Sequence, residues 1–429
     1  MTERPLIACH QCGQLHVRPV APAGGMGGCS RCGYVLFRQT GVSLNGWIAI
    51  AFAGLVVFAI ANWFPIAQFR LQGLTVNATL PEALWITWQQ GRYTIAVMAA
   101  LFAFVLPLGH ICFVLWALRA IQTRRLPYDF NLGMRVLHEI PRWSMVPVLV
   151  LAILVAVVKM ADLAVMRPGP AMWAYAGLTV LMTILGRITS QRLWRHAEDE
   201  GVVMRSGQGF DPKLPHADCA ACGFVQSIRD TQATVRCERC HTSMHFRKPQ
   251  HLSRAWALVI AASILYIPAN VLPVMNLRMP TGVSSHTILG GVIELWRLGS
   301  ADLAIVVFVA SVMVPMTKLL ALGVLMVRRR WDGVRVQRQR TRLYELVEFI
   351  GQWSMLDVFV VILLSSMGNF PGMSQITAGP GAAAFGLVVI LTMLAAMSYD
   401  PRIGWDQAKN ELPAVPSHRD NLPANRSPA

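Results

Sequence analysis

Several stretches of this sequence run for about twenty residues without a charge. Two examples are "GWIAIAFAGLVVFAIANWF" (46–64) and "GPGAAAFGLVVILTMLAAMS" (379–398). A helix of about 20 apolar residues can cross the hydrocarbon core of a bilayer, and it satisfies its own backbone hydrogen bonds there. Hydrophobic residues make up 54% and charged residues 14% of the 429 positions, whereas soluble domains carry about 25% charged residues. The sequence therefore predicts an all-α, multi-pass membrane protein.

The apolar runs and the breaks between them predict eight membrane spans. The fourth run is short, and the seventh has gradual edges. The predicted spans cover residues 46–66, 94–118, 142–163, 171–190, 254–275, 303–327, 350–369 and 380–398.

The basic residues give these spans an orientation. A net charge of +16 would suit a nucleic-acid-binding protein, but in membrane proteins Lys and Arg accumulate in the cytoplasmic loops. Arg-rich loops follow the second and sixth spans, whereas loops 67–93 and 276–302 are nearly balanced in charge. This distribution predicts that both Arg-rich loops and both termini are cytoplasmic. The first 40 residues are polar, so we expect no cleavable signal peptide.

Two cysteine clusters lie outside the predicted spans. Eight of the nine cysteines form CxxC pairs, separated by 16 residues in the first cluster and by 14 in the second. Such paired CxxC motifs are typical of zinc ribbons, in which two turns each contribute two thiolates to a tetrahedral site. Four thiolates leave no open coordination position, so the predicted zinc sites are structural, with iron as an alternative metal. The predicted ligands are Cys9, Cys12, Cys29, Cys32, Cys219, Cys222, Cys237 and Cys240.

The cysteines leave other interpretations open. Disulfides would require an oxidising compartment, whereas the predicted topology places both clusters in the cytoplasm. Nearby histidines could replace a thiolate, although we expect them to be bystanders; they are His10, His16, His241 and His245. The ninth cysteine, Cys112, lies in the second span and is expected to be a small buried hydrophobic side chain.

A repeat relates the two halves of the chain. With a shift of 208 residues Asn62 aligns with Asn270, and with a shift of 210 "WSM" at Trp143 aligns with "WSM" at Trp353. Each half is thus a cysteine cluster followed by four spans, and because four is even the halves are parallel repeats. Many transporters arose by such duplications. The predicted domains are a zinc ribbon at 1–42, a transmembrane module at 43–200, a second ribbon at 210–250, a second module at 251–402 and a disordered tail at 406–429.

Few polar side chains interrupt the predicted spans. A charge at the centre of a spanning helix costs about 2.5 to 3.5 kcal/mol on insertion scales, so each is a candidate functional residue. Lys318 lies too deep to reach the interface, and Asp357 is its candidate ion-pair partner. Lys159 and Asp162 could pair with each other, and Thr392 could bond to its own helix. The predicted polar cluster consists of Lys159, Asp162, Lys318, Asp357 and Thr392.

His110 holds, in the first half, the position that Lys318 holds in the second, three residues after a proline in each case. Proline lacks a backbone donor and can open the helix locally. We expect His110 to be a hydrogen-bonded polar residue rather than a proton relay. The sequence has no P-loop, no dinucleotide-binding glycine motif and no nucleophile–base arrangement, so no enzyme is predicted.

Four stretches resemble the paraquat-inducible protein A family, which includes inner-membrane lipid-transport subunits. They are "LYIPANVLPVMNL", "TILGGVIELWRLGS", "YELVEFIGQWSMLDVFVVILLSSM" and "MSYDPRIGWD". The resemblance covers nearly the whole chain but is looser in the first half, where Pro147 stands near the place that Asp357 holds in the repeat. It implies a bacterial inner-membrane subunit that exchanges phospholipid with a periplasmic conduit of mammalian-cell-entry (MCE) domains. The polar cluster would then be the energy-coupling or headgroup site.

Two other functions stay open on the sequence. The CxxC pairs could be thiol switches of a membrane-anchored redox or stress sensor, although such a sensor does not require ribbon spacing. An ion-coupled small-molecule transporter would use similar helices, but the spans are poor in the carboxylates and histidines that bind metal ions.

Overall fold

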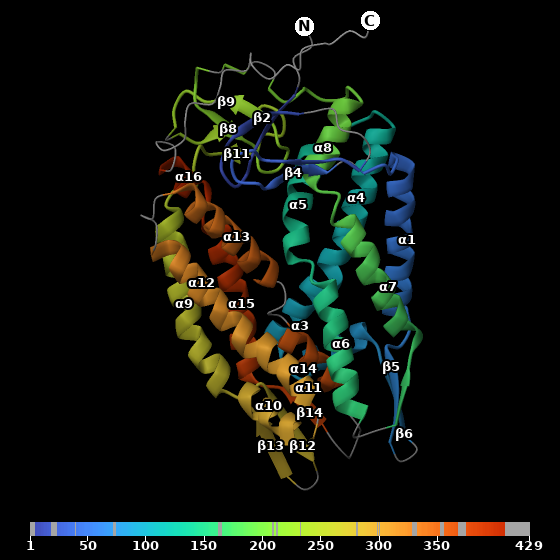
Figure 1. Cartoon of the computed structure of the whole chain (residues 1–429). Helices are drawn as coiled ribbons and strands as arrows, with labels where there is room; N and C mark the ends of the chain where they lie inside the picture. Colours follow the sequence, from blue (N-terminus) through green and yellow to red (C-terminus); the bar gives the residue numbers. More distant parts are fainter. Residues whose placement is uncertain are drawn as a thin grey trace, which may run out of the picture.

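A computed structural model describes most of the chain. The described residues are 5–18, 24–38, 40–71, 74–161, 165–207, 210–211, 213–231, 233–279, 282–297, 299, 301–327, 333–351, 356–367 and 375–407. Two small cysteine-containing domains lie at one end of a bundle of helices, and two small sheets lie at the other (Figure 1). We call these the ribbon end and the sheet end. Of the tail predicted at 406–429, residues 408–429 lie outside the described residues, and 406–407 belong to a helix.

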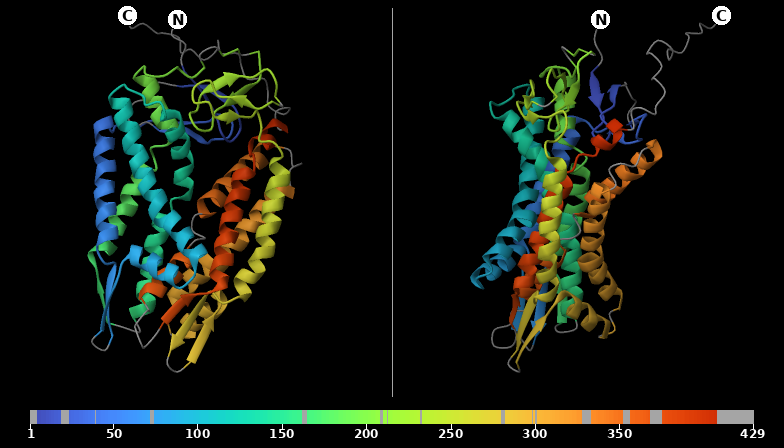
Figure 2. Two further views of the ribbon diagram at one scale, coloured as in Figure 1. Left: turned by 180° about the vertical axis from the view of Figure 1, so that it is seen from behind. Right: turned by 90° about the vertical axis from the view of Figure 1, so that its left-hand side faces the viewer.

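The helical bundle contains one order of elements twice. In the N-terminal half (44–199) the elements are α1 (Leu44–Trp63), β5 (Ala67–Leu71), β6 (Leu74–Ala78), α2 (Leu80–Gln89), α3 (Tyr93–Ala99), the π-helix η1 (Ala100–Val105), α4 (Leu106–Gln122), α5 (Phe130–Trp143), α6 (Val146–Ala161), β7 (Val165–Pro168), α7 (Pro170–Leu185) and α8 (Ser190–Asp199). In the C-terminal half (251–407) they are α9 (His251–Val271), β12 (Met275–Met279), β13 (Gly282–His286), α10 (Ile288–Arg297), α11 (Ala301–Phe308), the π-helix η2 (Val309–Met313), α12 (Val314–Val327), α13 (Val334–Gly351), α14 (Leu356–Met367), β14 (Gln375–Ala378), α15 (Pro380–Ser398) and α16 (Arg402–Gln407). The two halves stand side by side beneath the ribbon end (Figure 2).

Six helices of the described chain are long and apolar enough to cross a membrane, or seven if the bent pair α7 and α8 counts as one span. The six cover six of the eight predicted spans. The fourth predicted span, 171–190, falls on α7, whose axis turns by 53° into α8. The seventh, 350–369, falls largely on α14, and its residues 352–355 and 368–369 lie outside the described chain.

Each half ends its first long helix at the sheet end, and a short sheet follows there. The hairpins β5–β6 and β12–β13 each gain a third antiparallel strand from about a hundred residues later, giving the orders β6-β5-β7 and β13-β12-β14. The sequence had suggested loops for 67–93 and 276–302. Strands of five residues or fewer, with mixed polarity, carry a weak sequence signal.

Asparagines close the first helix of each half in the same way. Asn62 donates from Nδ2 to the carbonyl of Phe58, and Asn270 donates to the carbonyl of Tyr266, each at 2.8 Å. These are the asparagines that the repeat aligned. Each side chain therefore satisfies a backbone acceptor of the helix that it ends.

Glycines allow the chain to pass close to these helix ends. A Cβ atom at Gly169 would lie 2.0 Å from the carbonyl oxygen of Pro65, and one at Gly379 would lie 2.1 Å from that of Pro273. The amide of Gly379 donates to the carbonyl of Val274 at 2.7 Å. Each glycine is followed by a proline at the start of α7 or α15, where proline fits a helix.

We expect Gly379→Ala to destabilise the protein, because the added methyl group meets a backbone atom that must shift. Overpacking of this kind costs about 1 to 3 kcal/mol. Thermal unfolding of the purified protein measures the loss. Gly177→Ala on α7 is the matched control: no atom lies within 4 Å of its added Cβ, and alanine favours helix. An equal response of both variants would contradict the close approach.

Helix α14 forms the centre of the contact between the halves. It packs against α6 and α2 of the N-terminal half and against α15 of its own half. All residues from Val358 to Ser365 are buried. The hydroxyl oxygen of Ser365 lies 2.8 Å from the carbonyl oxygen of Ile376 and 3.0 Å from Oε1 of Gln90, so either can accept its proton. A helix buried on all sides in this way belongs to the core rather than to the lipid-facing surface.

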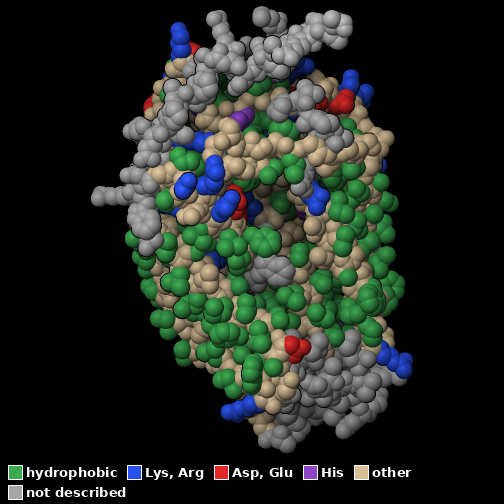
Figure 3. Space-filling model, in the orientation of Figure 1, with side chains coloured by type: hydrophobic (Ala, Val, Ile, Leu, Met, Phe, Trp, Pro, Cys, Tyr) green, Lys and Arg blue, Asp and Glu red, His purple; other side chains and the backbone are tan. Residues whose placement is uncertain are grey.

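The outer surface has the character of a membrane protein. Figure 3 shows hydrophobic side chains covering the middle of one face, while most Lys, Arg, Asp and Glu side chains gather toward the ribbon end. Large side chains such as Phe52, Ile264 and Leu320 are exposed on the spanning helices. Cys112 is also exposed on α4, so the expectation of a buried ninth cysteine was wrong.

Candidate functional site

Two four-cysteine cages form the ribbon end. In the first domain the hairpins are β1 (Leu6–Ala8) with β2 (Leu15–Val17) and β3 (Met26–Gly28) with β4 (Val35–Arg38); in the second they are β8 (His216–Asp218) with β9 (Val225–Ser227) and β10 (Val235–Arg236) with β11 (Ser243–Met244). We call these domains ribbon 1 and ribbon 2. Each CxxC pair forms the tight turn of one hairpin.

All four turns share one backbone geometry. The residue after each CxxC pair has positive φ and donates its amide to the carbonyl of the first cysteine, as Gly13 does to Cys9 at 2.7 Å. Three of these residues are glycines, which adopt this conformation at little cost. The fourth is His241. His241 thus forms part of the turn beside Cys240 through its backbone, and this role does not require its side chain to bind a metal.

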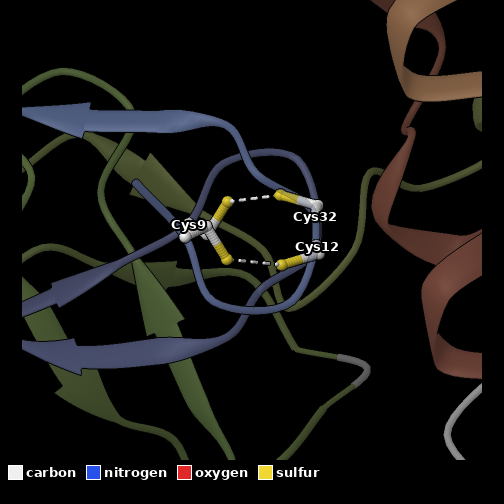
Figure 4. A group of neighbouring side chains, drawn as sticks. Cys9, Cys12 and Cys32 are labelled. Atoms are coloured by element: carbon white, nitrogen blue, oxygen red, sulfur yellow. Dashed lines mark hydrogen bonds between the residues drawn. The ribbon is translucent and has the colours of Figure 1, made fainter. Parts of the chain in front are cut away.

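The eight cysteines predicted as ligands are brought together in two groups of four. Within each cage all sulfur atoms lie within 4.8 Å of one another, and every cysteine is buried. The Sγ atoms of Cys9 and Cys32 are 3.5 Å apart (Figure 4). Those of Cys12 and Cys29 are also 3.5 Å apart. In ribbon 2 the corresponding distances are 3.4 and 3.5 Å. Four thiolates at about 2.3 Å from a tetrahedral zinc would lie about 3.8 Å apart, whereas a disulfide requires about 2.05 Å. The donor set fits a metal ion.

Two of the four nearby histidines have side-chain partners other than cysteine. His10 pairs with Asp218 at 2.7 Å, and Nε2 of His245 lies 2.9 Å from the hydroxyl of Thr234. His241 occupies the turn. His16 places Nε2 3.3 Å from Sγ of Cys29, outside the four-sulfur cage.

Ribbon 2 is held by the N-terminal half. The guanidinium group of Arg135 on α5 donates to the carbonyl of Cys240, and Ser190 on α8 donates to the carbonyl of Ala221 at 2.8 Å. Arg239 and Glu198 form a buried ion pair at 3.1 Å. The cage is thus fixed directly to α5 and α8.

Ribbon 1 reaches across to the C-terminal half. Trp405 on α16 is fully buried against the four cysteines of this cage. Its indole Nε1 donates to Thr341 on α13 at 3.1 Å, and its carbonyl accepts from Arg31 at 2.7 Å. The guanidinium group of Arg31 also lies 5.2 Å from the indole centroid. The same ribbon contacts α8 through Arg18 and Asp199.

An ionic network joins the two ribbons to α16. Asp218 of ribbon 2 contacts His10 of ribbon 1 at 2.7 Å and Arg402 of α16 at 3.2 Å. Burial opposes ionisation of Asp218, but the charges of His10 and Arg402 hold its pKa well below the usual range. Burial likewise opposes protonation of His10, yet the carboxylate raises its pKa. The two ribbons therefore act as one clip that bridges the halves.

We expect Trp405→Ala to release ribbon 1 from the C-terminal half. Truncation of a fully buried tryptophan costs about 3 to 5 kcal/mol, and the mutation also leaves Thr341 without its donor. Limited proteolysis of the purified protein should cut between ribbon 1 and α1 faster in this variant. Trp405→Phe keeps most of the packing, so its cleavage rate should lie between those of the wild type and Trp405→Ala. Unchanged cleavage in the alanine variant would contradict a role for Trp405 in the clip.

Of the predicted polar cluster, the structure describes only the side chains of Lys318 and Thr392. Asp162 lies outside the described residues, and for Lys159 and Asp357 the backbone is described but the side chain is not. Lys159 lies near the sheet-end terminus of α6, next to β7, whereas Asp357 lies at the start of α14. Thr392 on α15 is buried and donates to the carbonyl of Val389 at 2.9 Å. The helices that carry these residues pack against one another, α6 on α14 and α14 on α15.

Lys318 lies inside the protein. Its side chain is 2% exposed, and its Nζ has no hydrogen-bond partner among the described residues. A cavity of about 50 Å³ borders it, lined by residues of α13 and α15 and by Arg142 of α5. A Cβ atom at Gly351 would lie 3.0 Å from Nζ, so the glycine gives the ammonium group its space.

His110 has the same environment in the other half. It is also 2% exposed, and both ring nitrogens lack partners among the described residues. The expectation of a hydrogen-bonded histidine is therefore not met within the described part of the chain. The π-helices η1 and η2 come directly before the turns that carry His110 and Lys318, and π-helical turns are frequent at functional sites. The sequence indicates the aligned positions and the prolines before them, but it does not indicate the π-helices.

Comparison with known proteins identifies relatives over nearly the full length. The model of the family described as Paraquat-inducible protein A matches residues 44–198 and 252–409. The chain is 31% identical over 405 residues to "Intermembrane transport protein PqiA" of Escherichia coli, which covers 94% of this chain and 95% of the relative. It is 29% identical over 403 residues to "Lipophilic envelope-spanning tunnel protein A" of Escherichia coli, covering 93% and 90%. It is 27% identical over 408 residues to a "Probable intermembrane transport protein" of Haemophilus influenzae, covering 93% and 95%. No solved structure matches.

Proposed function

We propose that this chain, which belongs to the paraquat-inducible protein A family, is the inner-membrane subunit of an intermembrane lipid-transport system. It would load lipids into a periplasmic conduit of MCE domains or receive lipids from it, and so maintain the cell envelope. The observation that carries the proposal is the family match, which falls on both halves of the helical bundle. Two relatives are named for intermembrane transport and for an envelope-spanning tunnel. Each alignment covers at least 90% of both chains, so the similarity extends over the whole protein and is not limited to one domain.

The proposed topology places the ribbon end in the cytoplasm. The Arg-rich loop after α4 lies at this end, and Lys and Arg collect in cytoplasmic loops. Eight thiols in two cages also suit a reducing compartment. The two sheets would then face the periplasm, where the partner is. The proposed division is two ribbons and two tandem four-helix modules, with zinc as the structural metal in each ribbon.

The proposed site for energy coupling or headgroup binding is the polar cluster Lys159, Asp162, Lys318, Asp357 and Thr392. The burial of Lys318 and the burial of α14 between the halves support an interior site. A buried amine without a partner among the described residues is costly in an apolar bundle, which favours a functional reason for keeping it. Family membership fits a transport component rather than an enzyme.

Gentle extraction from bacterial membranes tests the proposal. We expect the tagged chain to retain a periplasmic MCE-domain protein and phospholipid through affinity purification, identified by mass spectrometry of peptides and lipids. A membrane protein of similar size from another family, extracted in parallel, controls for carry-over. Purification of the chain with neither a periplasmic partner nor lipid above this control would contradict the proposed function.

A further inference from the structure

A second cavity lies between α13 and the helices of the N-terminal half, and Lys318 is not among its lining residues. It is open on one side, has a volume of about 660 Å³ and is lined by α4, the α5–α6 connection, the end of α7 and α13. Figure 3 shows the molecule hollowed between α13 and α5, below the ribbons. Sites for small ligands commonly have volumes of about 300 to 1,000 Å³. The cavity is therefore large enough for a lipid headgroup with its glycerol.

The inner wall of this cavity carries His110. A neutral imidazole has one N–H donor and one acceptor, and in this side chain neither has a partner among the described residues. An unpaired buried polar group costs about 1 to 3 kcal/mol. The ring borders the cavity, so a ligand placed there would supply the missing partner.

Two arginines line the same cavity. Arg142 is held in place on one side: its NH1 donates to both carboxylate oxygens of Glu139 at 2.9 and 3.0 Å, and its NH2 lies 3.3 Å from Nε2 of His138. Arg187, two residues after the end of α7, is exposed, and no ion pair with a carboxylate is found for it among the described residues. No Asp or Glu is among the described residues that line the cavity. The lining thus favours an anion.

The rest of the lining is apolar. Val146 and Val148 are buried at the start of α6, and Met182 is buried on α7. Phe349 of α13 borders the cavity while 65% of its surface is exposed. Cationic groups and an apolar wall in one cavity suit a molecule with an anionic head and an apolar body. Guanidinium groups in particular match the geometry of phosphate oxygens.

We propose that His110, Arg142 and Arg187 bind the phosphate of a membrane phospholipid, whose acyl chains leave the cavity past Phe349. The proposal rests on the proposed function and assigns to it a second lipid-binding position, distinct from Lys318. Arg142 also borders the cavity of Lys318. Arg142 would thus stand between the bound phosphate and the cavity of the buried amine.

Lipid binding to the purified full-length protein in detergent tests this assignment. The probe is fluorescent phosphatidylglycerol, and the test variant is the double substitution Arg142→Gln with Arg187→Gln. We expect its affinity to fall by about ten-fold or more, because two charge-assisted contacts are lost. Arg119→Gln removes a cation from the exposed ribbon end of α4, outside the cavity, and should bind as the wild type does. Equal affinities in the double variant and this control would overturn the proposal.

A second variant, at His110, is expected to fold normally and therefore separates loss of lipid binding from misfolding. His110→Leu keeps a similar volume but removes the two ring nitrogens that lack partners among the described residues, so we expect thermal stability to be maintained or raised while lipid affinity falls. Unchanged lipid affinity in a stable His110→Leu protein would overturn the role of the imidazole. Both measurements use the isolated chain, so they do not depend on a periplasmic partner.

Inorganic phosphate separates the two sources of the anion. If the site is built for a phospholipid, millimolar phosphate should displace the fluorescent lipid only weakly, because it lacks the apolar contacts. Phosphate binding that depends on Arg142 and Arg187, with lipid binding that does not, would assign the cavity to a free anion and overturn the headgroup assignment. Binding of the fluorescent lipid at this site, with neither a periplasmic partner nor lipid retained on extraction from membranes, would instead contradict only the proposed function.

Discussion

The double substitution Cys219→Ser with Cys222→Ser is expected to reduce the metal content of the purified protein from about two ions per chain to about one. The structure contains two separate cages of four buried thiols, and the substitution removes half of the ligands of one cage. Binding of a structural zinc ion contributes about 10 to 16 kcal/mol in small zinc domains. Ribbon 2 should therefore lose its fold, and with it the contacts that hold it to α5 and α8.

Elemental analysis by mass spectrometry measures this prediction and identifies the metal. The matched control is Cys112→Ser, which alters the ninth cysteine on the exposed face of α4 and should leave the metal content unchanged. Wild-type protein that contains neither zinc nor iron, with thiols that cycle between oxidised and reduced states, would support the redox-sensor alternative and contradict the ribbon assignment.

The cages could be predicted from the sequence because their geometry is local. A CxxC turn places two sulfur atoms on one side of a hairpin by itself, and two such turns separated by 14 or 16 residues meet within one small domain. The spans were predictable for a similar reason, since each helix satisfies its own backbone. The repeat also appeared in the sequence, because both halves kept the asparagine that ends the first helix and the WSM motif.

Contacts between distant segments could not be predicted in this way. Nothing near Trp405 in the sequence indicates that it lies against cysteines some four hundred residues earlier. The third strands β7 and β14 join hairpins from about a hundred residues before them. In a membrane protein the apolar pattern is also less informative, because buried and lipid-facing helices are both apolar on all sides. The burial of α14 between the halves, and the hydrogen-bonding state of His110, depend on packing that only the structure shows.

Replacing Lys318 with methionine is expected to abolish function while the protein still accumulates in the membrane. The amine is buried without a partner among the described residues, and a charge at such a depth costs about 2.5 to 3.5 kcal/mol on insertion scales. Methionine has a similar length and is flexible enough to fill the same space. The variant should therefore be at least as stable as the wild type, so a loss of function cannot be attributed to misfolding.

Complementation of an envelope-stress phenotype, in a bacterial strain that lacks the family, measures this loss alongside protein abundance. Leu320→Met, two residues away on the lipid-facing side of α12 with 66% of its surface exposed, is the matched control and should complement fully. Asp357→Asn, which keeps the shape of the side chain, should fail as Lys318→Met does if the two groups act together. A charged group that takes part in coupling or headgroup binding cannot be replaced by a neutral group without loss of function. Full complementation by both Lys318→Met and Asp357→Asn would therefore contradict a role of the polar cluster in transport and leave it a role in membrane insertion alone.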